Sequence, residues 1–526
     1  MKKVKINFKK QKSSSSYDFS NLLVLDLANN HQGSVKHGSK IIKETAKIIR
    51  NLKVRAGIKF QFRQLDTFIH KKHQKNSKES YVKRFKSTEM SLNDYKTLLD
   101  RVKKENIISI CTPFDESSVD IAADMGFEIL KIASCSAKDW PLLEKVSNSN
   151  LPIIISTGGL EVHEIDNIVS FFEHKGVDFA IMHCVSVYPS PNAILGLNQI
   201  DRLINRYPNI TVGWSTHENP NDLMPISIAV AKGAKIFERH IGLETNKIKL
   251  NQYSSTPKQL ERWMSAYKEA IKICGSGNEK NITNIEKDSL NQLRRGVFAK
   301  RVIKKGMKIF LNDIYFAFPY QSGQLDSEKW KPGTIVKKNI LADSPIKEVD
   351  IRPPKQSRNL PLKHAIHDVK ALLNEAKIIL GDEFKIEYSH HYGIKNFHKI
   401  GATIINCINR EYAKKIIVQL PGQKHPKHYH KRKEETFQVL YGVLHSDLNG
   451  KNKILYPGDT LLVQPGVWHS FWTDAGCIFE EVSTTHFDDD SFYKDKKIND
   501  MKRKDCLLYT SPSPRDATLS RMPSSA

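Results

Sequence analysis

The chain has 526 residues, more than a single hydrophobic core usually organises, so two or three domains are expected. Its 82 Lys and Arg residues exceed its 57 Asp and Glu residues, and the formal net charge of +25 suits an anionic partner. The lysines are scattered, however, and the sequence contains no RNP-like aromatic motif, zinc finger or long basic block. Nucleic acid is therefore not expected as a partner.

Cysteine usage and hydropathy bear on the compartment. The seven cysteines form an odd set without a CxxC pair, which favours reduced thiols over a disulfide framework. The first sixteen residues are basic and Ser-rich but lack the apolar stretch of a secretory signal, and no run approaches the length of a membrane span. We expect a soluble cytoplasmic protein without a membrane partner.

Eight short apolar runs alternate with amphipathic segments from Asn21 to about Leu243. Near-continuous apolar strands that alternate with helices are typical of a buried parallel sheet. Eight units favour a closed (β/α)8 TIM barrel over residues 17–275, with an open doubly wound sheet as the alternative. The expected strands are Leu22 to Ala28, Gly57 to Phe62, Ile107 to Thr112, Ile129 to Ser134, Pro152 to Thr157, Phe179 to Cys184, Ile210 to Ser215 and Lys235 to His240.

Two polar linkers, 274–287 and 352–361, divide the rest of the chain. Between them, residues 290–352 form a small module with short β-like runs, and residues 362–495 form a unit that is β-rich after one helix. Residues 506–526 change abruptly to Ser, Pro and Arg and resemble translated sequencing-adapter read-through; a native disordered tail is the alternative. The tail is excluded from the expected fold.

Two lysines lie inside apolar strands, near the expected carboxyl ends. Burying an unpaired ammonium is costly, and an anion bound between Lys59 and Lys131 would remove that cost. A lysine that reaches the rim with its charged end is the alternative for either position alone. Two such residues on neighbouring strands favour a phosphate or carboxylate clamp.

Small hydroxyl side chains recur at the same level. Any single one is explained by capping of the following helix. Together they surround the lysines, and hydroxyls at the start of loops into helices bind phosphate oxygens well. The hydroxyl residues are Thr112, Ser134, Ser156, Ser186 and Ser215.

Two histidines follow the last two strands. His217 and His240 match no local metal motif, and a lone histidine is more often simply hydrogen-bonded. In a barrel, adjacent strands bring these imidazoles together and leave coordination positions open for water and substrate. Asp26, at the end of the first strand, is the carboxylate best placed to move a proton or bind a sugar hydroxyl.

These barrel residues resemble those of one family, the N-acetylneuraminate (sialic acid) synthases and their relatives that make legionaminic, pseudaminic and spore-coat sugars. The resemblance spans nearly the whole barrel in order. The matching strings are NNHQGS (29–34), KFQ (59–61), CTPFDESS (111–118), LKIAS (130–134), ISTGG (155–159), MHCVSVYPSP (182–191), VGWSTHE (212–218) and FERHIGL (237–243).

The resemblance implies an enzyme, a transferase that condenses phosphoenolpyruvate with a sugar aldehyde and releases phosphate in surface glycan biosynthesis. It implies manganese or magnesium on His217 and His240, with Asp26 and the two lysines as further catalytic groups. The residues implied for phosphoenolpyruvate are Lys59, Thr112, Lys131, Ser134, Ser156 and Ser215, and further substrate contacts are implied at Gln61, Ser186, Tyr188 and Asn251.

Several positions depart from the family pattern. Asp26 stands where Glu is usual, Ser186 where Asn often contacts phosphoenolpyruvate, and Asn251 near an acidic residue that touches the sugar. The loop after the second strand (FRQLDTFIHKKH) does not align with the usual sugar-binding loop. The donor half of the site is therefore better matched than the acceptor half, and the acceptor is not fixed as N-acetylmannosamine.

The module over residues 290–352 resembles the antifreeze-like (SAF, β-clip) domain of these synthases, through LRRGVFAKRVIKKGMKI and KPGTIVKKNI. The resemblance implies a domain-swapped homodimer in which this module offers an Arg to the sugar. Here Phe318 stands near the position of that Arg. The polar sugar contact is therefore not expected from this residue.

The last unit resembles a cupin β-barrel, through GQKHPKHYHKRKEETFQVLYG (422–442) and GDTLLVQPGVWH (458–469). Strand alternation places His428 and His430 on one face, and Glu435 and His469 complete a divalent metal set for Zn²⁺, Fe²⁺, Mn²⁺ or Ni²⁺. A structural or regulatory cupin with a vestigial site is the alternative.

Three functions stay open on the sequence. The first is a nonulosonate synthase with a fused cupin. The second is a metal-dependent sugar isomerase or epimerase driven by the cupin, with a barrel that has drifted. The third is a non-catalytic sugar sensor. Retained lysines and histidines in the barrel favour the first, since a drifted barrel loses costly buried groups first.

Overall fold

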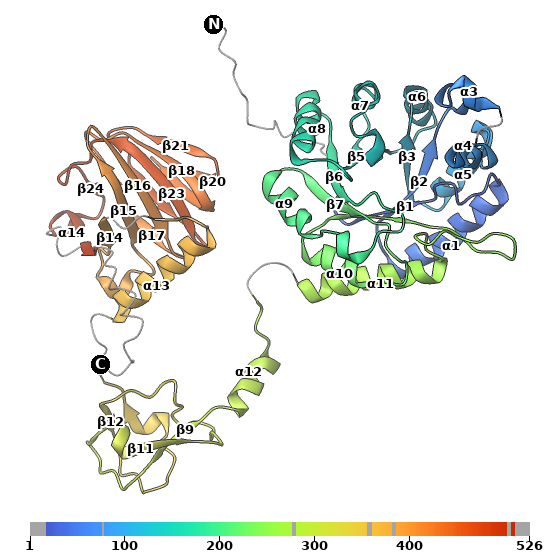
Figure 1. The fold of residues 1–526 in the computed structure, drawn as a ribbon. Coiled ribbons are helices and arrows are strands. Elements are labelled where there is room, and N and C mark those ends of the chain that lie inside the picture. The colour runs from blue at the N-terminus through green and yellow to red at the C-terminus, as the bar shows by residue number, and fades with distance from the viewer. Residues whose placement is uncertain are drawn as a thin grey trace. The chain divides into compact units, whose positions relative to one another are not determined.

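The computed structural model describes residues 17–75, 78–275, 280–354, 360–380, 385–501 and 507–510. The chain forms two compact units, Met1–Lys280 and Asn281–Ala526. Figure 1 shows a barrel in the first unit and two smaller β structures in the second. The first sixteen residues, where no secretory signal was expected, and residues 511–526 of the predicted tail lie outside the described residues.

The first unit is a closed barrel of eight parallel strands. Strand β1 pairs with both β2 and β8, which closes the sheet and excludes the open doubly wound alternative. The strands are β1 (Leu22–Asp26), β2 (Ala56–Phe62), β3 (Ile108–Pro113), β4 (Ile129–Ile132), β5 (Ile153–Ser156), β6 (Phe179–Cys184), β7 (Thr211–Ser215) and β8 (Ile236–His240).

Helices surround the barrel (Figure 1). They are α1 (Val35–Leu52), α5 (Leu92–Lys104), α6 (Glu116–Asp124), α7 (Trp140–Ser147), α8 (Val162–Lys175), α9 (Asn198–Arg206), α10 (Met224–Ala231) and α11 (Pro257–Cys274). Three short helices lie between β2 and α5, namely α2 (Leu65–Phe68), α3 (Lys71–Gln74) and α4 (Ser80–Ser87). No helix in the described ranges is long and apolar enough to cross a membrane.

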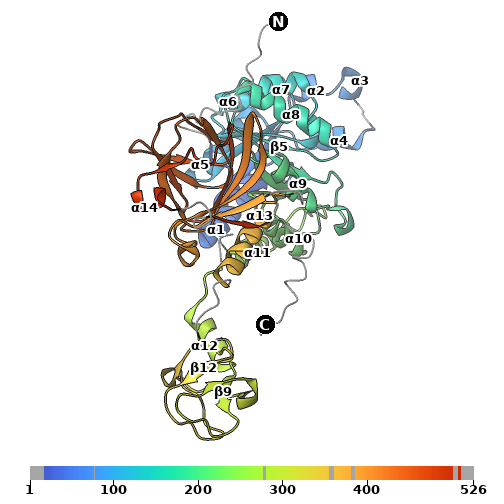
Figure 2. The same cartoon turned by 90° about the vertical axis from the view of Figure 1, so that its left-hand side faces the viewer.

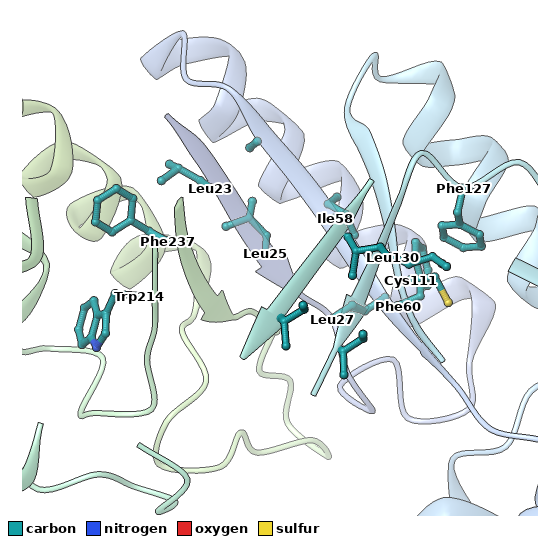
Figure 3. Close-up of a cluster of buried hydrophobic side chains, with 14 of the residues drawn as sticks. Leu23, Leu25, Leu27, Ile58, Phe60, Cys111, Phe127, Leu130, Trp214 and Phe237 are labelled. Carbon is teal, nitrogen blue, oxygen red and sulfur yellow. The ribbon is translucent and has the colours of Figure 1, made fainter. Parts of the chain in front are cut away.

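Alternation along each strand separates two cores. Figure 3 shows one of them, in which Leu23, Leu25 and Ile58 belong to a cluster that also contains helix residues. Residues of the opposite parity, such as Leu22 and Val24, pack with one another in a second cluster inside the barrel. The interior positions become polar at the carboxyl ends of the strands, and this change of residue type creates the site.

The second unit begins with α12 (Asn284–Gln292) and a small β domain. Its strands form a pair, β9 with β11, and a three-stranded sheet in the order β10-β12-β13, around a common apolar core. The strands are β9 (Gly296–Ala299), β10 (Lys308–Ile309), β11 (Ile314–Ala317), β12 (Thr334–Val336) and β13 (Ile351–Arg352).

The remaining chain forms a seven-stranded and a five-stranded antiparallel sheet, seen from two directions in Figures 1 and 2. Phe437 and Phe479 from one sheet pack with Leu444 and Phe471 from the other in one buried cluster, as in a cupin β-barrel. The fold class predicted from the sequence is therefore confirmed.

The strands of this β-barrel are β14 (Lys385–Ser389), β15 (Ala402–Asn409), β16 (Tyr412–Gln419), β17 (Lys424–Tyr429), β18 (Glu435–Gly442), β19 (Leu444–Leu448), β20 (Lys451–Leu455), β21 (Thr460–Val463), β22 (His469–Trp472), β23 (Cys477–Thr484) and β24 (Phe492–Tyr493). Helices α13 (Leu360–Glu375) and α14 (Lys496–Asn499) flank them. Strand β25 (Leu507–Thr510) pairs with β14, so this short part of the predicted tail joins the sheet.

Candidate active site and metal centre

A ring of polar side chains occupies the carboxyl ends of the barrel strands. These residues continue the interior parity of each strand, because Asp26 follows Val24 and Lys131 follows Ile129 at a spacing of two. The ring consists of Asp26, Lys59, Gln61, Thr112, Lys131, Ser156, Ser215, Glu238 and His240.

Lys59 and Lys131 are buried, but neither is an unpaired cation. Lys59 Nζ lies 3.0 Å from Asp26 Oδ2 and 2.5 Å from Glu238 Oε1. Lys131 Nζ lies 3.4 Å from Glu238 Oε2. Two buried carboxylates therefore offset the burial of both lysines, and the anion clamp stays a prediction.

The charges of these four groups shape one another. Burial opposes ionisation of Glu238, yet the two lysines hold its pKa well below the usual range. Burial lowers the pKa of Lys131, whereas the carboxylates that bond to Lys59 raise its pKa despite burial. The formal charges of the two lysines and the two carboxylates sum to zero. An incoming phosphate therefore competes with Glu238 for Lys131, because Glu238 contacts Lys131 at a longer distance than Lys59.

Two hydroxyl groups of the ring are buried without a hydrogen-bond partner in the described part of the chain, Thr112 Oγ1 and Ser156 Oγ. Buried polar atoms normally have partners, so unpartnered ones indicate a binding site for a polar ligand. Ser134 and Ser215 both interact with the buried Cys184 thiol, whose pKa is raised by burial. The hydroxyls therefore gather beside Lys131, which lies close enough to that thiol to oppose the rise.

Gly158 brings the remaining hydroxyls together. Its backbone N–H donates to Ser134 Oγ at 3.0 Å. A Cβ atom at this position would lie 2.5 Å from Ser186 Oγ and 2.9 Å from Ser134 Oγ. Only glycine permits the backbone to approach both hydroxyls so closely.

The two predicted metal histidines face each other at the same end of the barrel. The ring centroids of His217 and His240 are 5.4 Å apart. His217 Nδ1 contacts the Val185 carbonyl oxygen at 3.1 Å, which leaves Nε2 available as a ligand. Burial lowers the pKa of His217 to about 3 and also lowers that of His240, so both rings are neutral, as metal ligands must be.

Asp26 connects the histidines to the lysines. Its Oδ2 atom accepts a hydrogen bond from Gln61 Nε2 at 3.0 Å and lies 3.5 Å from His240 Nδ1. Burial favours the neutral acid, but Lys59 holds the pKa of Asp26 below its usual value. Asp26 is therefore a carboxylate that can accept a proton.

Aromatic rings cover the histidine pair. Tyr188 lies 4.2 Å from His217, and Tyr253 lies 6.0 Å from His217 and 5.1 Å from His240, measured between ring centroids. Asn251 Oδ1 accepts the backbone N–H groups of Tyr253 and Ser254 at 3.2 and 2.8 Å. The predicted substrate contact Asn251 thus holds the turn that positions Tyr253.

The cupin unit brings its predicted ligands together. His428, His430 and His469 offer nitrogen atoms within 4.8 Å of one another, and no other such group of three occurs in the described ranges. Glu435 lies between two of them, with Oε1 3.3 Å from His430 Nε2 and Oε2 3.2 Å from His469 Nε2. Three imidazoles and one carboxylate suit a divalent transition metal.

Backbone carbonyls orient these rings. His428 Nδ1 contacts Pro426 O and His469 Nδ1 contacts Val467 O, each at 3.0 Å. His430 Nδ1 likewise contacts the Asp490 carbonyl oxygen. A Nδ1–H donated to a carbonyl leaves Nε2 as the ligand atom, and the buried Nε2 atoms of His430 and His469 both face Glu435.

A cavity of about 420 Å³ opens beside the histidines. Lys433 Nζ bonds to Glu435 Oε1 at 2.5 Å and to Glu481 Oε1 at 3.0 Å, and Lys415 Nζ lies 3.6 Å from Glu481. The cavity has the volume of a small-molecule site. These charged residues were not singled out from the sequence.

Three residues of the barrel site were likewise missed. Glu238 shares the interior parity of His240 on β8, but its pairing with both lysines was not anticipated. Gly158 lies within the ISTGG string, and Tyr253 lies two residues after Asn251. A search for carboxylates at interior parity beside buried lysines would have found Glu238.

Comparison with known proteins shows which families this chain resembles. Residues 51–279 match the NeuB family and residues 416–476 match the cupin domain. A crystal structure of a candidate spore coat polysaccharide biosynthesis protein E from Chromobacterium violaceum is 40% identical, with a TM-score of 0.59, and covers 63% of this chain and 100% of its own.

Two curated relatives extend the comparison. An uncharacterised protein of Methanocaldococcus jannaschii is 35% identical over 55% of this chain and 82% of its own. An N,N'-diacetyllegionaminic acid synthase of Campylobacter jejuni is 28% identical over 54% of this chain and 86% of its own. The fold and site define a TIM-barrel protein with a fused cupin. The chain belongs to the NeuB family, which confirms the resemblance inferred from the sequence.

Proposed function

We propose that the barrel is a nonulosonic acid synthase that condenses phosphoenolpyruvate with an aldose. The observation that carries this proposal is the cluster of two buried lysines and unpartnered buried hydroxyls beside a histidine pair. Membership of the NeuB family and the named activity of the Campylobacter jejuni relative support it.

In this proposal the donor lies among the lysines and hydroxyls. The unpartnered hydroxyls of Thr112 and Ser156 donate hydrogen bonds to phosphate or carboxylate oxygens. Lys131 exchanges its 3.4 Å contact with Glu238 for a contact with a phosphate oxygen. Ser134 and Ser186, held by Gly158, close the other side. Phosphoenolpyruvate thereby becomes fixed with its methylene carbon toward the histidines.

The histidine pair is suited to hold manganese or magnesium, since two neutral imidazoles converge beside a carboxylate and leave further positions for substrate oxygens. When bound there, the ion supplies Lewis-acid polarisation of the acceptor aldehyde. His217 and His240 would be its ligands, with Asp26 adjacent.

The reaction forms one carbon–carbon bond and breaks one carbon–oxygen bond. C3 of phosphoenolpyruvate attacks the aldehyde carbon, and the aldehyde oxygen takes up a proton. Water adds at C2 and loses a proton, for which ionised Asp26 is the acceptor. Loss of phosphate from C2 then leaves a 2-keto acid sugar, and Lys59 and Lys131 stabilise the departing charge.

The test uses purified protein, phosphoenolpyruvate, Mn²⁺ and a panel of hexosamines and simple aldoses, with phosphate release and product mass measured together. We expect phosphate release that depends on a sugar and a product heavier than the sugar by the pyruvyl unit. Turnover should disappear in His217→Ala and His240→Ala. Wild-type rates in both variants would refute the assignment of these residues.

We further propose that His428, His430, Glu435 and His469 hold a second divalent metal ion in the cupin. The converging histidine nitrogens and the Glu435 carboxylate between two of them support this set. If the cupin has a separate function, such as sugar isomerisation, loss of these ligands should leave condensation in the barrel unchanged.

A further inference from the structure

A buried ion pair joins the two chain segments that carry the histidine pair. Arg239 and Glu218 are both fully buried. Arg239 follows Phe237 on β8 at a spacing of two, and Phe237 packs in the apolar cluster that the strands share with the helices (Figure 3). The Arg239 Cζ atom lies 5.7 Å from the ring centroid of Trp263 on α11. A charged side chain therefore occupies the helix-facing side of β8, where its neighbours of the same parity are apolar.

The guanidinium group of Arg239 bonds only to this chain. Its Nη1 donates to Glu218 Oε1 at 2.7 Å, and its Nη2 donates to the Glu218 carbonyl oxygen at 3.4 Å. Its Nε donates to Ser255 Oγ at 2.7 Å. All three nitrogens thus have protein acceptors, so the group is arranged to hold chain segments together rather than to bind a ligand.

The ion pair connects residues that adjoin both histidines. Glu218 directly follows His217, and Arg239 directly precedes His240. The backbone pairing of β7 with β8 ends two residues before His217. Beyond that point, the bonds between Arg239 and Glu218 continue the connection between the two segments.

The third bond of Arg239 reaches the turn that covers the histidines. Ser255, which accepts from Arg239 Nε, donates its backbone N–H to the His240 carbonyl oxygen at 2.9 Å. Tyr253 lies two residues before Ser255 and packs on both imidazoles. One buried side chain therefore links the segments that carry His217, His240 and Tyr253.

The gain in stability from such a pair does not account for its presence. Replacing a buried ion pair by apolar side chains of similar volume is often neutral or stabilising. In addition, Glu218 Oε2 is buried without a hydrogen-bond partner in the described part of the chain, which costs free energy. A role in fixing geometry explains a charged pair in an apolar layer better than a role in stability does.

We propose that Glu218 and Arg239 are positioning residues, which hold the imidazoles of His217 and His240 at the separation that a shared divalent metal ion requires. The inference rests on the metal site of the proposed synthase. Neither side chain touches a reacting atom, and the lysines proposed to bind phosphoenolpyruvate lie on β2 and β4. Loss of the pair should therefore weaken metal binding more than donor binding.

The test measures Mn²⁺ affinity and melting temperature of the full chain in wild type, Glu218→Leu, Arg239→Met and the double variant. The barrel site is defined as the Mn²⁺ equivalent that His217→Ala loses, followed by electron paramagnetic resonance of free Mn²⁺. Each single variant should melt at a lower temperature, because it leaves one buried group unpaired. The double variant should regain most of that loss, yet its Kd for Mn²⁺ at the barrel site should stay at least tenfold above wild type.

A double variant that binds Mn²⁺ within threefold of wild type would overturn the proposal, because the pair would then be needed for folding alone. If the double variant does not fold, Ser255→Ala decides, since it removes one hydrogen bond and keeps the ion pair. We expect a Kd for Mn²⁺ at least threefold higher in Ser255→Ala. An unchanged Kd there would equally overturn the proposal.

Two further readouts separate positioning from a general loss of structure. The Mn²⁺ concentration for half-maximal turnover should rise at least tenfold in the double variant, while the KM for phosphoenolpyruvate changes less than threefold. An equal rise in both would show general damage to the site and contradict the proposal. Arg206→Met is the matched control, since Arg206 bonds to Asp166 at 2.7 and 2.6 Å between helices remote in sequence from the histidines, and its Kd for Mn²⁺ should equal that of wild type.

The Mn²⁺ titration needs no acceptor sugar, so the two proposals fail separately. If no aldose is condensed but the Kd values change as expected, the synthase function fails and the positioning role stands. If His217→Ala retains every Mn²⁺ equivalent of wild type, the barrel holds no metal ion on this residue. The positioning role is then overturned, whether or not condensation occurs.

Discussion

Gly158 lies where the backbone reaches the hydroxyls of Ser134 and Ser186. In Gly158→Ala the new Cβ would lie 2.5 Å from Ser186 Oγ, and at least one hydroxyl must move. We expect the KM for phosphoenolpyruvate to rise about tenfold or more, equivalent to roughly 1.4 kcal/mol of lost binding.

The control for this change is Gly176→Ala at the end of α8. Gly176 has φ +68° with nothing within 4 Å of an added Cβ, so alanine strains the backbone without touching the site. It should lower stability by about 1 kcal/mol and leave the KM unchanged. An unaltered KM in Gly158→Ala would remove the hydroxyl pair from the donor site.

Glu238 offsets the burial of two lysines. Removing one partner of a buried ion pair typically costs about 3–5 kcal/mol, so Glu238→Gln should lower the unfolding free energy of the barrel by an amount of this order. The folded-state pKa of Glu238 is depressed. Its stabilisation is therefore present above the unfolded pKa of about 4.3 and is lost as pH falls toward the folded pKa.

Scanning calorimetry across this pH range measures the effect. Wild type should lose stability steadily as pH falls below about 5, while Glu238→Gln should show a flatter profile, so that the two converge in acid. Parallel profiles would show that Glu238 does not carry the charge assigned to it.

Among the secondary-structure elements, the strands were largely predictable and their side-chain partnerships were not. Strand β6 has the bounds expected from the sequence, and the other seven differ at their ends by one or two residues. Continuous apolar runs reveal such strands because both faces are buried. Period 2 also places Asp26 and His240 on the interior face.

The contacts of Arg63 with Phe85 and Phe114 were less predictable, because these residues meet only after a loop with three short helices folds back. The pairing of Glu238 with Lys59 and Lys131 depends on strand order around a closed barrel. No local spacing encodes either arrangement. Local spacing did identify the cupin histidines in the sequence. The pairing of β17 with β22 then brings His469 opposite His428.

Strands β17, β18 and β22 carry or directly precede the residues proposed to bind the cupin metal ion, so loss of that ion should affect this unit alone. His428→Ala should reduce bound transition metal by about one equivalent per chain, measured by elemental analysis after dialysis. Turnover in the barrel should persist with added Mn²⁺. His445→Ala is the control, since His445 stacks on Trp472 and belongs to no ligand group.

Retention of metal in His428→Ala would contradict the ligand set. Equal loss of metal and condensation would instead show that the two sites are coupled. Either result is visible in one preparation, because metal content and phosphate release are measured on the same sample.

At the scale of the whole molecule, the family resemblance predicts a domain-swapped homodimer. The small β domain, which the resemblance implies is exchanged, exposes the apolar side chains of Phe318, Leu341 and Val349. Light scattering of the full chain should give about twice 60.1 kDa, and a chain ending at Lys280 should be monomeric. A monomeric full chain with full synthase activity would exclude the swap.

In the proposed reaction, condensation proceeds with cleavage of the carbon–oxygen bond of phosphoenolpyruvate. The most direct measurement uses phosphoenolpyruvate labelled with ¹⁸O in the bridging oxygen, an accepted aldose and Mn²⁺, followed by mass analysis of the phosphate. We expect one ¹⁸O in each phosphate released together with the 2-keto acid sugar. Unlabelled phosphate, with ¹⁸O retained in pyruvate, would show simple hydrolysis and contradict it.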